Sequence, residues 1–307
     1  MSYIIGSFNL RKMANTDKKN INAIAGIILQ EHMDIVALQE VFRPEAIGKL
    51  IQALGPLEWE LSWKNPEKNE SNNANEGYAY IWRKRRLKKV ETVLPNNKIR
   101  KFEPRIYNQY RKLGSEGILR PPYYGRFTPS GLPGGNEMEL RLLNIHIRFS
   151  GTDFDSDIKA RQREAIILSQ ELLPIIQDRV YGTNYNTYTL ILGDYNLNID
   201  NGINNSPYLY SFIELNRNGK TINIVTEQDQ KTTLKQNQDL EFLYDEERFA
   251  NNYDHFTFDN SIREKCAILQ CRRVDGHKYI DNDFLRYKNE ISDHMPILIE
   301  IDIRGGE

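Results

Sequence analysis

Several apolar stretches of this chain begin or end with side chains that can bind metals or move protons. These side chains are Asn9 after YIIGSF, Glu40 after DIVALQ, His146 within LRLLNIHI, Asp194 and Asn196 after TLILG, Asp254 before HFTF, and Asp293 and His294 before MPILIEI. Carboxylates bind hard cations, amides orient phosphates, and histidines transfer protons near neutral pH. One such residue alone is typical of a turn or a solvated strand end. The whole set indicates an active site that combines acid–base and metal chemistry.

The stretches that carry these residues have the pattern of β-strands separated by helices. Strands are predicted at 3–9, 34–41, 77–83, 87–94, 140–147, 187–196, 255–259 and 295–303, and helices at 21–32, 157–180 and 206–219. Pro174 is expected to kink or divide the second helix. For the third, Pro207 near its start and Gly219 after its end follow the usual helix asymmetry. Segments 65–77 and 95–137 are expected to be long surface loops. Polar residues that end buried strands collect at one edge of a sheet, where ligands bind.

Composition places the chain among globular proteins. Of 307 residues, 39% are hydrophobic and 27% charged, and the net charge is −1. No general basic field therefore attracts a polyanion, and any attraction for phosphate must be local. The start, MSYIIGSFNLRKM, lacks the basic region and apolar run of a signal peptide, and no apolar stretch approaches the roughly 20 residues of a membrane helix. We expect a cytoplasmic protein without a membrane partner or an obligate protein partner.

The ordered set of motifs resembles the endonuclease/exonuclease/phosphatase superfamily. The matching segments are the Asn9 strand, LQE, NIHI, GDYN, YDHF and SDHMP, spread over residues 4–301. No linker or change of composition divides the chain. The resemblance implies an α+β fold, a four-layer α/β/β/α sandwich of two packed mixed β-sheets flanked by helices. Residues 1–307 would form a single catalytic domain of this type.

Within the superfamily, the chain most resembles deoxyribonuclease I-like enzymes. Glu76 enters the alternating aromatic strand EGYAYIWR, and Arg120 precedes proline in LRPPYYGRF. The resemblance implies that Glu76 orients His146 and that Asp254 orients His294, with one histidine acting as base and the other as acid. The remaining roles that it implies are a metal site of Glu40, Asn9 and Asp293, catalytic Asp194 and Asn196, and substrate contacts from Arg120, Asn9, Asn196 and Tyr123. The cation would be Mg²⁺, with Mn²⁺ or Ca²⁺ substituting for it or occupying a second site.

Local charge makes nucleic acid, and DNA in particular, the expected partner. The stretch 98–112, KIRKFEPRIYNQYRK, interleaves basic residues with Phe102, Tyr107 and Tyr110, which suits phosphate contact and base stacking. The basic stretch 83–89, RKRRLKK, is more typical of a solvated strand edge. A phosphatase or phospholipase of the same superfamily is the alternative. A non-catalytic binding protein on the same fold is a third possibility, although every group that catalysis needs is present.

Overall fold

A computed structural model describes most of the chain. The described residues are 2–14, 18–65, 76–93, 98–108, 117–131, 138–149, 155–181, 186–200, 209–217, 219–236, 240 and 242–303. Tyr110 and most of the predicted loop 65–77 lie outside them. No helix in the described ranges has the length and hydropathy to cross a bilayer.

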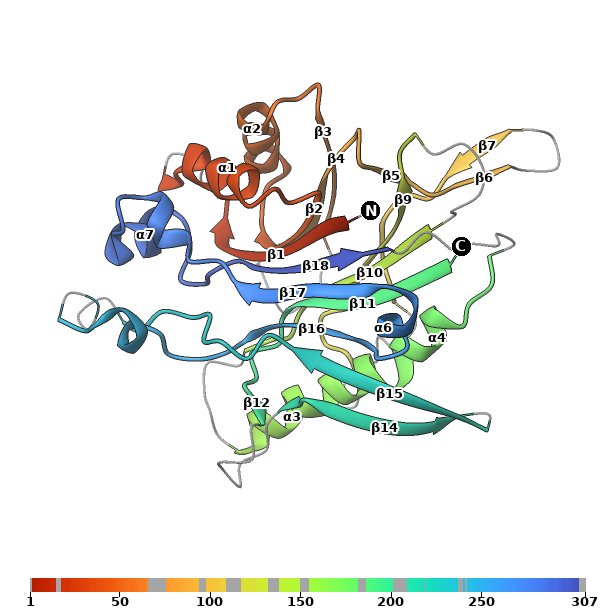
Figure 1. The fold of residues 1–307 in the computed structure, drawn as a ribbon. Helices are drawn as coiled ribbons and strands as arrows, with labels where there is room; N and C mark the ends of the chain where they lie inside the picture. Colours follow the sequence, from red (N-terminus) through yellow and green to blue (C-terminus); the bar gives the residue numbers. More distant parts are fainter. Residues whose placement is uncertain are drawn as a thin grey trace.

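Two mixed β-sheets form the centre of the molecule (Figure 1). The first has the order β17 (Ala267–Arg273), β18 (Ile297–Asp302), β1 (Ser2–Met13), β2 (Ile35–Val41), β4 (Gly77–Arg83), β3 (Trp59–Lys64). The second has the order β14 (Phe212–Arg217), β15 (Lys220–Glu227), β16 (Asp254–Asp259), β11 (Asn186–Asp194), β10 (Met138–His146), β9 (Tyr123–Pro129), β5 (Leu87–Lys89), and β8 (Arg105–Ile106) also pairs with β9. Within the sheets, β1–β2 and β10–β11 are parallel. Two short pairs lie outside the sheets, β6 (Glu91–Val93) with β7 (Ile99–Lys101) and β12 (Ile199–Asp200) with β13 (Leu209–Tyr210).

Helices cover the outer faces of both sheets, which gives the expected four layers (Figure 1). On the first sheet lie α1 (Ile21–Gln30) and α2 (Pro44–Leu54), and on the second lie α3 (Asp155–Ile166), η2 (Ile167–Leu172) and α4 (Leu173–Gln177). Shorter helices are η3 (Asp245–Arg248), α6 (Ile262–Lys265), η4 (Gly276–Tyr279) and α7 (Phe284–Glu290). Three apolar cores fill the spaces between the layers, and the middle one joins the two sheets.

Local chemistry explains where these helices begin and divide. The Asn20 side chain caps α1 by accepting the Ala23 N–H at 3.0 Å. Pro174 lies in the first turn of α4, directly after the π-helical η2. Proline lacks the N–H that an α-helix interior needs, and the wider turn accommodates that loss. The predicted division of this helix is therefore confirmed.

The predicted helix at 206–219 is wrong, because the described part of this segment is extended. Phe212–Arg217 forms the edge strand β14, and its exposure alternates along the sequence. Arg217 of β14 pairs directly with Lys220 of β15, so the two strands form a β-hairpin, and the sequence between the paired residues reads Asn-Gly. Asn-Gly is a strong hairpin signal, and here it outweighs the helix signals of Pro207 and Gly219.

The predicted loop at 95–137 is also wrong for part of its length. Strands β7, β8 and the whole of β9 fall inside it, and β9 lies within the second sheet. The β-branched and aromatic residues of YYGRFTP fit a buried strand, since every residue of β9 is buried.

Candidate active site

Strand alternation places the predicted polar residues between the two sheets. In β10, β11 and β16 the inward residues are Leu142, Leu192 and Phe256, so residues at even positions face the middle core. His146, Asp194 and Asp254 continue those inward rows, and they are register neighbours at one edge of the second sheet. From the first sheet, β1 and β2 contribute Asn9 and Glu40, and His294 precedes β18. The structure therefore brings these strand ends together from two sheets, whereas the sequence analysis expected them at one edge of a single sheet.

Two histidine–carboxylate pairs form the centre of the site. His146 Nδ1 is hydrogen-bonded to Glu76 Oε1, and His294 Nδ1 lies 2.8 Å from Asp254 Oδ2. The opposite ring nitrogens converge on one atom: His146 Nε2 lies 3.5 Å, and His294 Nε2 3.6 Å, from Asp194 Oδ2. A carboxylate on Nδ1 fixes the tautomer and orientation of an imidazole. Both Nε2 atoms are thus presented to the same small region.

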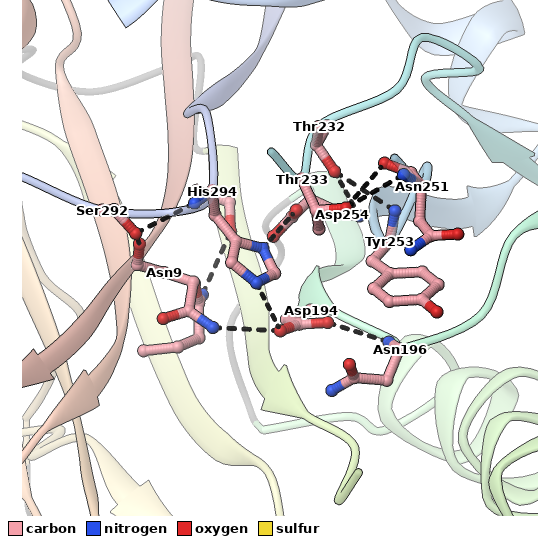
Figure 2. A network of polar contacts seen from close by, with 12 residues as sticks. Asn9, Asp194, Asn196, Thr232, Thr233, Asn251, Tyr253, Asp254, Ser292 and His294 are labelled. Carbon is pink, nitrogen blue, oxygen red and sulfur yellow. Dashed lines mark hydrogen bonds and ion pairs between the residues drawn. The ribbon is translucent and has the colours of Figure 1, made fainter. Parts of the chain in front are cut away.

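Hydrogen bonds hold Asp194 beside the His294 ring, as Figure 2 shows. Its Oδ1 accepts the Asn196 N–H at 2.8 Å, and its Oδ2 accepts Asn9 Nδ2 at 3.0 Å. Asn196 has a left-handed backbone (φ 49°), which asparagine tolerates. Its side chain donates to the Ile147 carbonyl at 2.8 Å, which ties the end of β11 to the end of β10.

His294 is fixed from both sheets. The Ser292 hydroxyl accepts the His294 N–H at 3.1 Å and donates to the Asn9 carbonyl at 2.7 Å (Figure 2). On the other side, Thr232 Oγ1 accepts the Asp254 N–H at 3.3 Å. The pair of His294 and Asp254 is therefore braced along its backbone as well as through its side chains.

Glu40 lies beside Asn9 in an irregular part of β2. Its φ is +55°, and the pairing of β2 with both neighbours shifts register here. Such irregularities re-aim a side chain, and backbone strain of this kind collects at functional sites. Glu40 Oε1 accepts Asn9 Nδ2 at 3.2 Å and Oε2 accepts the Lys12 N–H at 2.9 Å. Asp293, predicted for the same site, is one-third exposed and lies 3.2 Å from Arg11 Nε.

Burial and charge act on the ionisation of the central groups. Burial by itself lowers the pKa of His294, but the carboxylates of Asp254 and Asp194 outweigh it and raise that pKa well above its ordinary value. For His146, the effect of burial is likewise outweighed by Glu76, and the pKa is raised. Burial raises the pKa of Asp194 despite the two imidazoles. The site therefore favours added positive charge next to Asp194.

The residues near Asp194 offer ligands for a divalent cation. Within the described ranges, Asp194, Asp254 and His294 each present one ligand atom within 4.8 Å of the others. His294 Nδ1 and Asp254 Oδ2 already bond to each other, so a cation there would compete with that pair. Glu40, Asn9 and Asp194 form an adjoining row of oxygen-bearing groups. The oxygen chemistry of this row fits a hard cation such as Mg²⁺.

Arg120 reaches the outer side of the first histidine pair. Its guanidinium lies 2.9 Å from Glu76 Oε2 and donates to the His146 carbonyl at 3.1 Å. Sequence reasoning missed the group that holds it, Glu164 of α3. The buried Glu164 carboxylate accepts the backbone N–H groups of Leu119 and Arg120, and burial raises its pKa to about 7. A lone glutamate inside an amphipathic helix gave no signal for this role.

Sequence reasoning also missed the buried tyrosines that hold the backbone of β10 at His146. The buried Tyr78 hydroxyl accepts the His146 N–H at 3.1 Å, and the Tyr80 hydroxyl accepts the Asn144 N–H at 3.0 Å. Gln39 donates to Asn144 Oδ1 at 2.8 Å across the sheets. The sequence signal that could have revealed this support was the presence of polar side chains within otherwise apolar strands, because buried polar groups need hydrogen-bond partners.

Tyr123 does not lie at the site, which corrects its predicted role in substrate binding. Its side chain is fully buried in the middle core, its ring stacks on Tyr80, and its hydroxyl pairs with Ser62 Oγ at 2.7 Å. A side chain with no exposed surface cannot contact a polyanion. Tyr123 is the inward residue of a β-strand that the sequence analysis placed in a loop.

The basic stretch 83–89 has local partners, as its interpretation as a solvated strand edge implies. Arg86 Nε pairs with Asp34 at 2.9 Å, and Lys89 pairs with Glu103 at 2.8 Å and Glu60 at 3.4 Å. Surface pairs of this kind contribute little stability, and they leave less free charge for a ligand.

Comparison with solved structures identifies the fold. The chain is similar to an endonuclease/exonuclease/phosphatase family protein from Bacteroides thetaiotaomicron (16% identity, TM-score 0.58, 99% of this chain and 98% of that one). It is also similar to a mannosyl-6-phosphatase from the same organism (16%, TM-score 0.57, 97% and 99%) and to D. rerio TDP2 in complex with a single-strand DNA product (13%, TM-score 0.56, 98% and 99%). No protein-family model and no curated protein matches the sequence. The chain has the fold of the endonuclease/exonuclease/phosphatase superfamily, as the motifs predicted.

Proposed function

We propose that this protein is a divalent-metal-dependent phosphodiesterase that hydrolyses DNA. The observation that carries the proposal is the convergence of His146 Nε2 and His294 Nε2 on Asp194 Oδ2, at 3.5 and 3.6 Å, with a carboxylate on each Nδ1. Phosphodiester hydrolysis needs a base for water and an acid for the leaving oxygen. Two oriented imidazoles facing one region meet that need.

The two pairs would divide the proton transfers. One imidazole takes a proton from the attacking water through Nε2, while its carboxylate stabilises the imidazolium that forms. The other imidazolium donates a proton from Nε2 to the leaving alkoxide. Asp194 lies between the two rings, where it can orient water, and Asn196 keeps Asp194 in place.

Positive groups on two sides would neutralise the negative charge of the phosphate. Arg120 is anchored to Glu76 and to the His146 carbonyl, so its guanidinium is fixed beside the first pair. On the other side, Glu40, Asn9 and Asp293 would hold Mg²⁺, with Mn²⁺ or Ca²⁺ as substitutes. When bound, the cation would supply Lewis-acid stabilisation of the phosphoryl oxygen. Asn9 and Asn196 amides would add hydrogen bonds to substrate.

Support for DNA comes from local charge and from one neighbour in fold. D. rerio TDP2 is described in complex with a single-strand DNA product. In this chain Arg100, Lys101 and Arg105 are exposed on the stretch that interleaves basic and aromatic residues. The mannosyl-6-phosphatase neighbour supports the second candidate, a phosphatase that acts on a small phosphomonoester.

The test compares matched histidine substitutions on a substrate panel. Plasmid, single-stranded DNA, RNA and mannose 6-phosphate are incubated with Mg²⁺, with and without EDTA. His146→Asn and His294→Asn should each lower kcat on DNA by about 10²-fold or more. His32→Asn, at an exposed histidine, is the control. Full activity in His294→Asn would end the mechanism, and phosphate release from mannose 6-phosphate without DNA cleavage would favour the phosphatase.

A further inference from the structure

A cavity on the outer side of the second sheet combines aromatic rings with an excess of positive charge. Its volume is about 600 Å³, and its lining includes Lys64, Arg100, Phe102, Arg105, Arg126 and Tyr181. Residues of β7 and β8 line it, and β7 lies on the side of the molecule away from α7 (Figure 1). No residue of the candidate active site lines it.

Arg126, in the wall of the cavity, belongs to a buried ion cluster with more cations than anions. Arg126 bonds Glu139 through two nitrogens, at 2.6 and 2.8 Å, and Arg141 Nε bonds the same carboxylate at 2.7 Å. All three side chains are at most 4% exposed. Within these ion pairs two guanidinium groups face one carboxylate. Arg141 also donates to the carbonyls of Ile176 and Gln177 at the end of α4. The cluster as a whole carries one net positive charge, and Arg126 is its member that borders the cavity.

Aromatic rings and exposed cations form the rest of the cavity. The Arg126 guanidinium lies 3.7 Å from the Tyr181 ring centre and 5.1 Å from that of Phe102. The Arg105 guanidinium lies 5.4 Å from the Phe102 ring centre. The acidic lining residue, Glu103, pairs with Lys89 at 2.8 Å and so does little to offset the rim cations. Cations beside ring faces suit a ligand that is both planar and anionic.

We infer that this cavity is a second binding site, which takes the phosphate and base of a nucleotide. Phosphate would meet Arg126 and the rim arginines, and the base would stack on Phe102 or Tyr181. The role of the site within catalysis rests on the proposed function: β8 pairs with β9 at Arg105 and Tyr124, and Arg120 of the candidate active site lies four residues before Tyr124. A nucleic-acid strand could therefore pass from the active site to the cavity.

Binding without turnover provides the test. A fluorescent oligo(dT) strand is titrated with the full chain in EDTA, at several salt concentrations, and followed by anisotropy. Arg100→Ala/Arg105→Ala removes two exposed cations of the rim, and Lys84→Ala/Arg85→Ala removes two exposed cations of the basic stretch 83–89 as the matched control. The rim variant should bind about tenfold more weakly, and its salt slope should fall by about 1.4, at 0.7 per phosphate contact on a single strand. The control variant should bind oligo(dT) within about twofold of the wild-type affinity and should keep the wild-type salt slope.

Tyr181→Leu tests the stacking component separately. It keeps every cation, and it should weaken oligo(dT) binding about fivefold or more. Competition by dTMP would show that the site also accepts a free nucleotide, while competition by longer oligonucleotides alone would assign it to a nucleic-acid strand. Equal competition by poly-glutamate, with no effect of Tyr181→Leu, would overturn the inference, because any basic surface behaves so.

A small diester separates this inference from the proposed function. The cavity lining shares no residue with the candidate active site, so the rim variant should hydrolyse bis(p-nitrophenyl) phosphate at the wild-type rate. A chain that hydrolyses no phosphodiester but binds oligo(dT) through the rim would refute the nuclease and keep the binding site. Unchanged oligo(dT) binding in the rim variant would refute the binding site alone.

Discussion

The substitution Asp254→Asn tests the second histidine pair most directly. Asp254 Oδ2 lies 2.8 Å from His294 Nδ1, and the residue is 1% exposed, so water cannot replace the lost charge. Asparagine has the same shape and can still accept the Nδ1 proton. The substitution therefore removes charge and leaves packing almost unchanged.

The magnitude follows from the geometry of the pair. With roughly 4 Å between the charge centres and an effective dielectric constant of about 20, the carboxylate stabilises an imidazolium by about 4 kcal/mol. At 1.36 kcal/mol per tenfold, kcat on a DNA substrate should fall about 10³-fold. KM should change little, because His294 acts on protons rather than on binding.

Asp259→Asn, at the other end of β16, is the matched control. Asp259 accepts the Ser261 N–H at 3.0 Å, and asparagine can do the same, so kcat should stay near that of the wild type. Thermal unfolding of both variants checks that the fold is kept. An Asp254→Asn enzyme with more than a tenth of wild-type kcat would refute the assigned role. Recovery of activity at high Mg²⁺ would instead make Asp254 a metal ligand.

Three further predictions concern charge and metal binding. Burial against Phe284 lowers the pKa of His277 to about 4. The stability that neutral His277 contributes is therefore complete above about pH 6.5 and is lost as the pH falls towards 4. Between pH 7 and pH 5, calorimetry should show that His277→Phe loses about 2 kcal/mol less free energy of unfolding than the wild type, which corresponds to a Tm decrease smaller by about 3 °C. Burial raises the pKa of Glu164 to about 7, so the wild type loses stability as the pH rises from about 4.5 to 7. The Tm of Glu164→Gln should therefore rise relative to the wild-type Tm between pH 5 and pH 8. An equal change of Tm with pH in both proteins would contradict the burial argument. Glu40→Gln should raise the Mg²⁺ concentration for half-maximal DNA cleavage about tenfold or more, because it removes one ligand charge, and an unchanged Mg²⁺ titration would remove Glu40 from the metal site.

Side-chain periodicity explains why so much of the site could be predicted. Alternation along a strand fixes which residues face inward, and this required no knowledge of the partner strand. His146 and Asp194 each end an apolar strand of the second sheet, so their meeting at one edge was predictable, whereas Asn9 joins them from the first sheet. The two packed sheets with helices outside were predicted from the family resemblance, and the structure confirms them.

In two segments the local signals that were followed led to the wrong structure. Phe212–Arg217 carries helix signals, yet its register against β15 makes it a strand. Tyr123 follows the arginine of the site by three residues, yet β9 turns its ring into the core. In both cases a tertiary partner outweighed local propensity.

The sequence by itself determined which chemical groups this protein has and on which strand ends they stand, because periodicity and residue type are local properties. Only the tertiary structure decided how these groups pair. Glu76 and His146 are 70 residues apart, and Asp254 and His294 are 40 apart, so their contacts depend on how whole strands register. The left-handed backbone of Glu40 and the support of Arg120 by Glu164 also arise from packing between elements. Those long-range constraints set distances and pKa values, which no local pattern encodes.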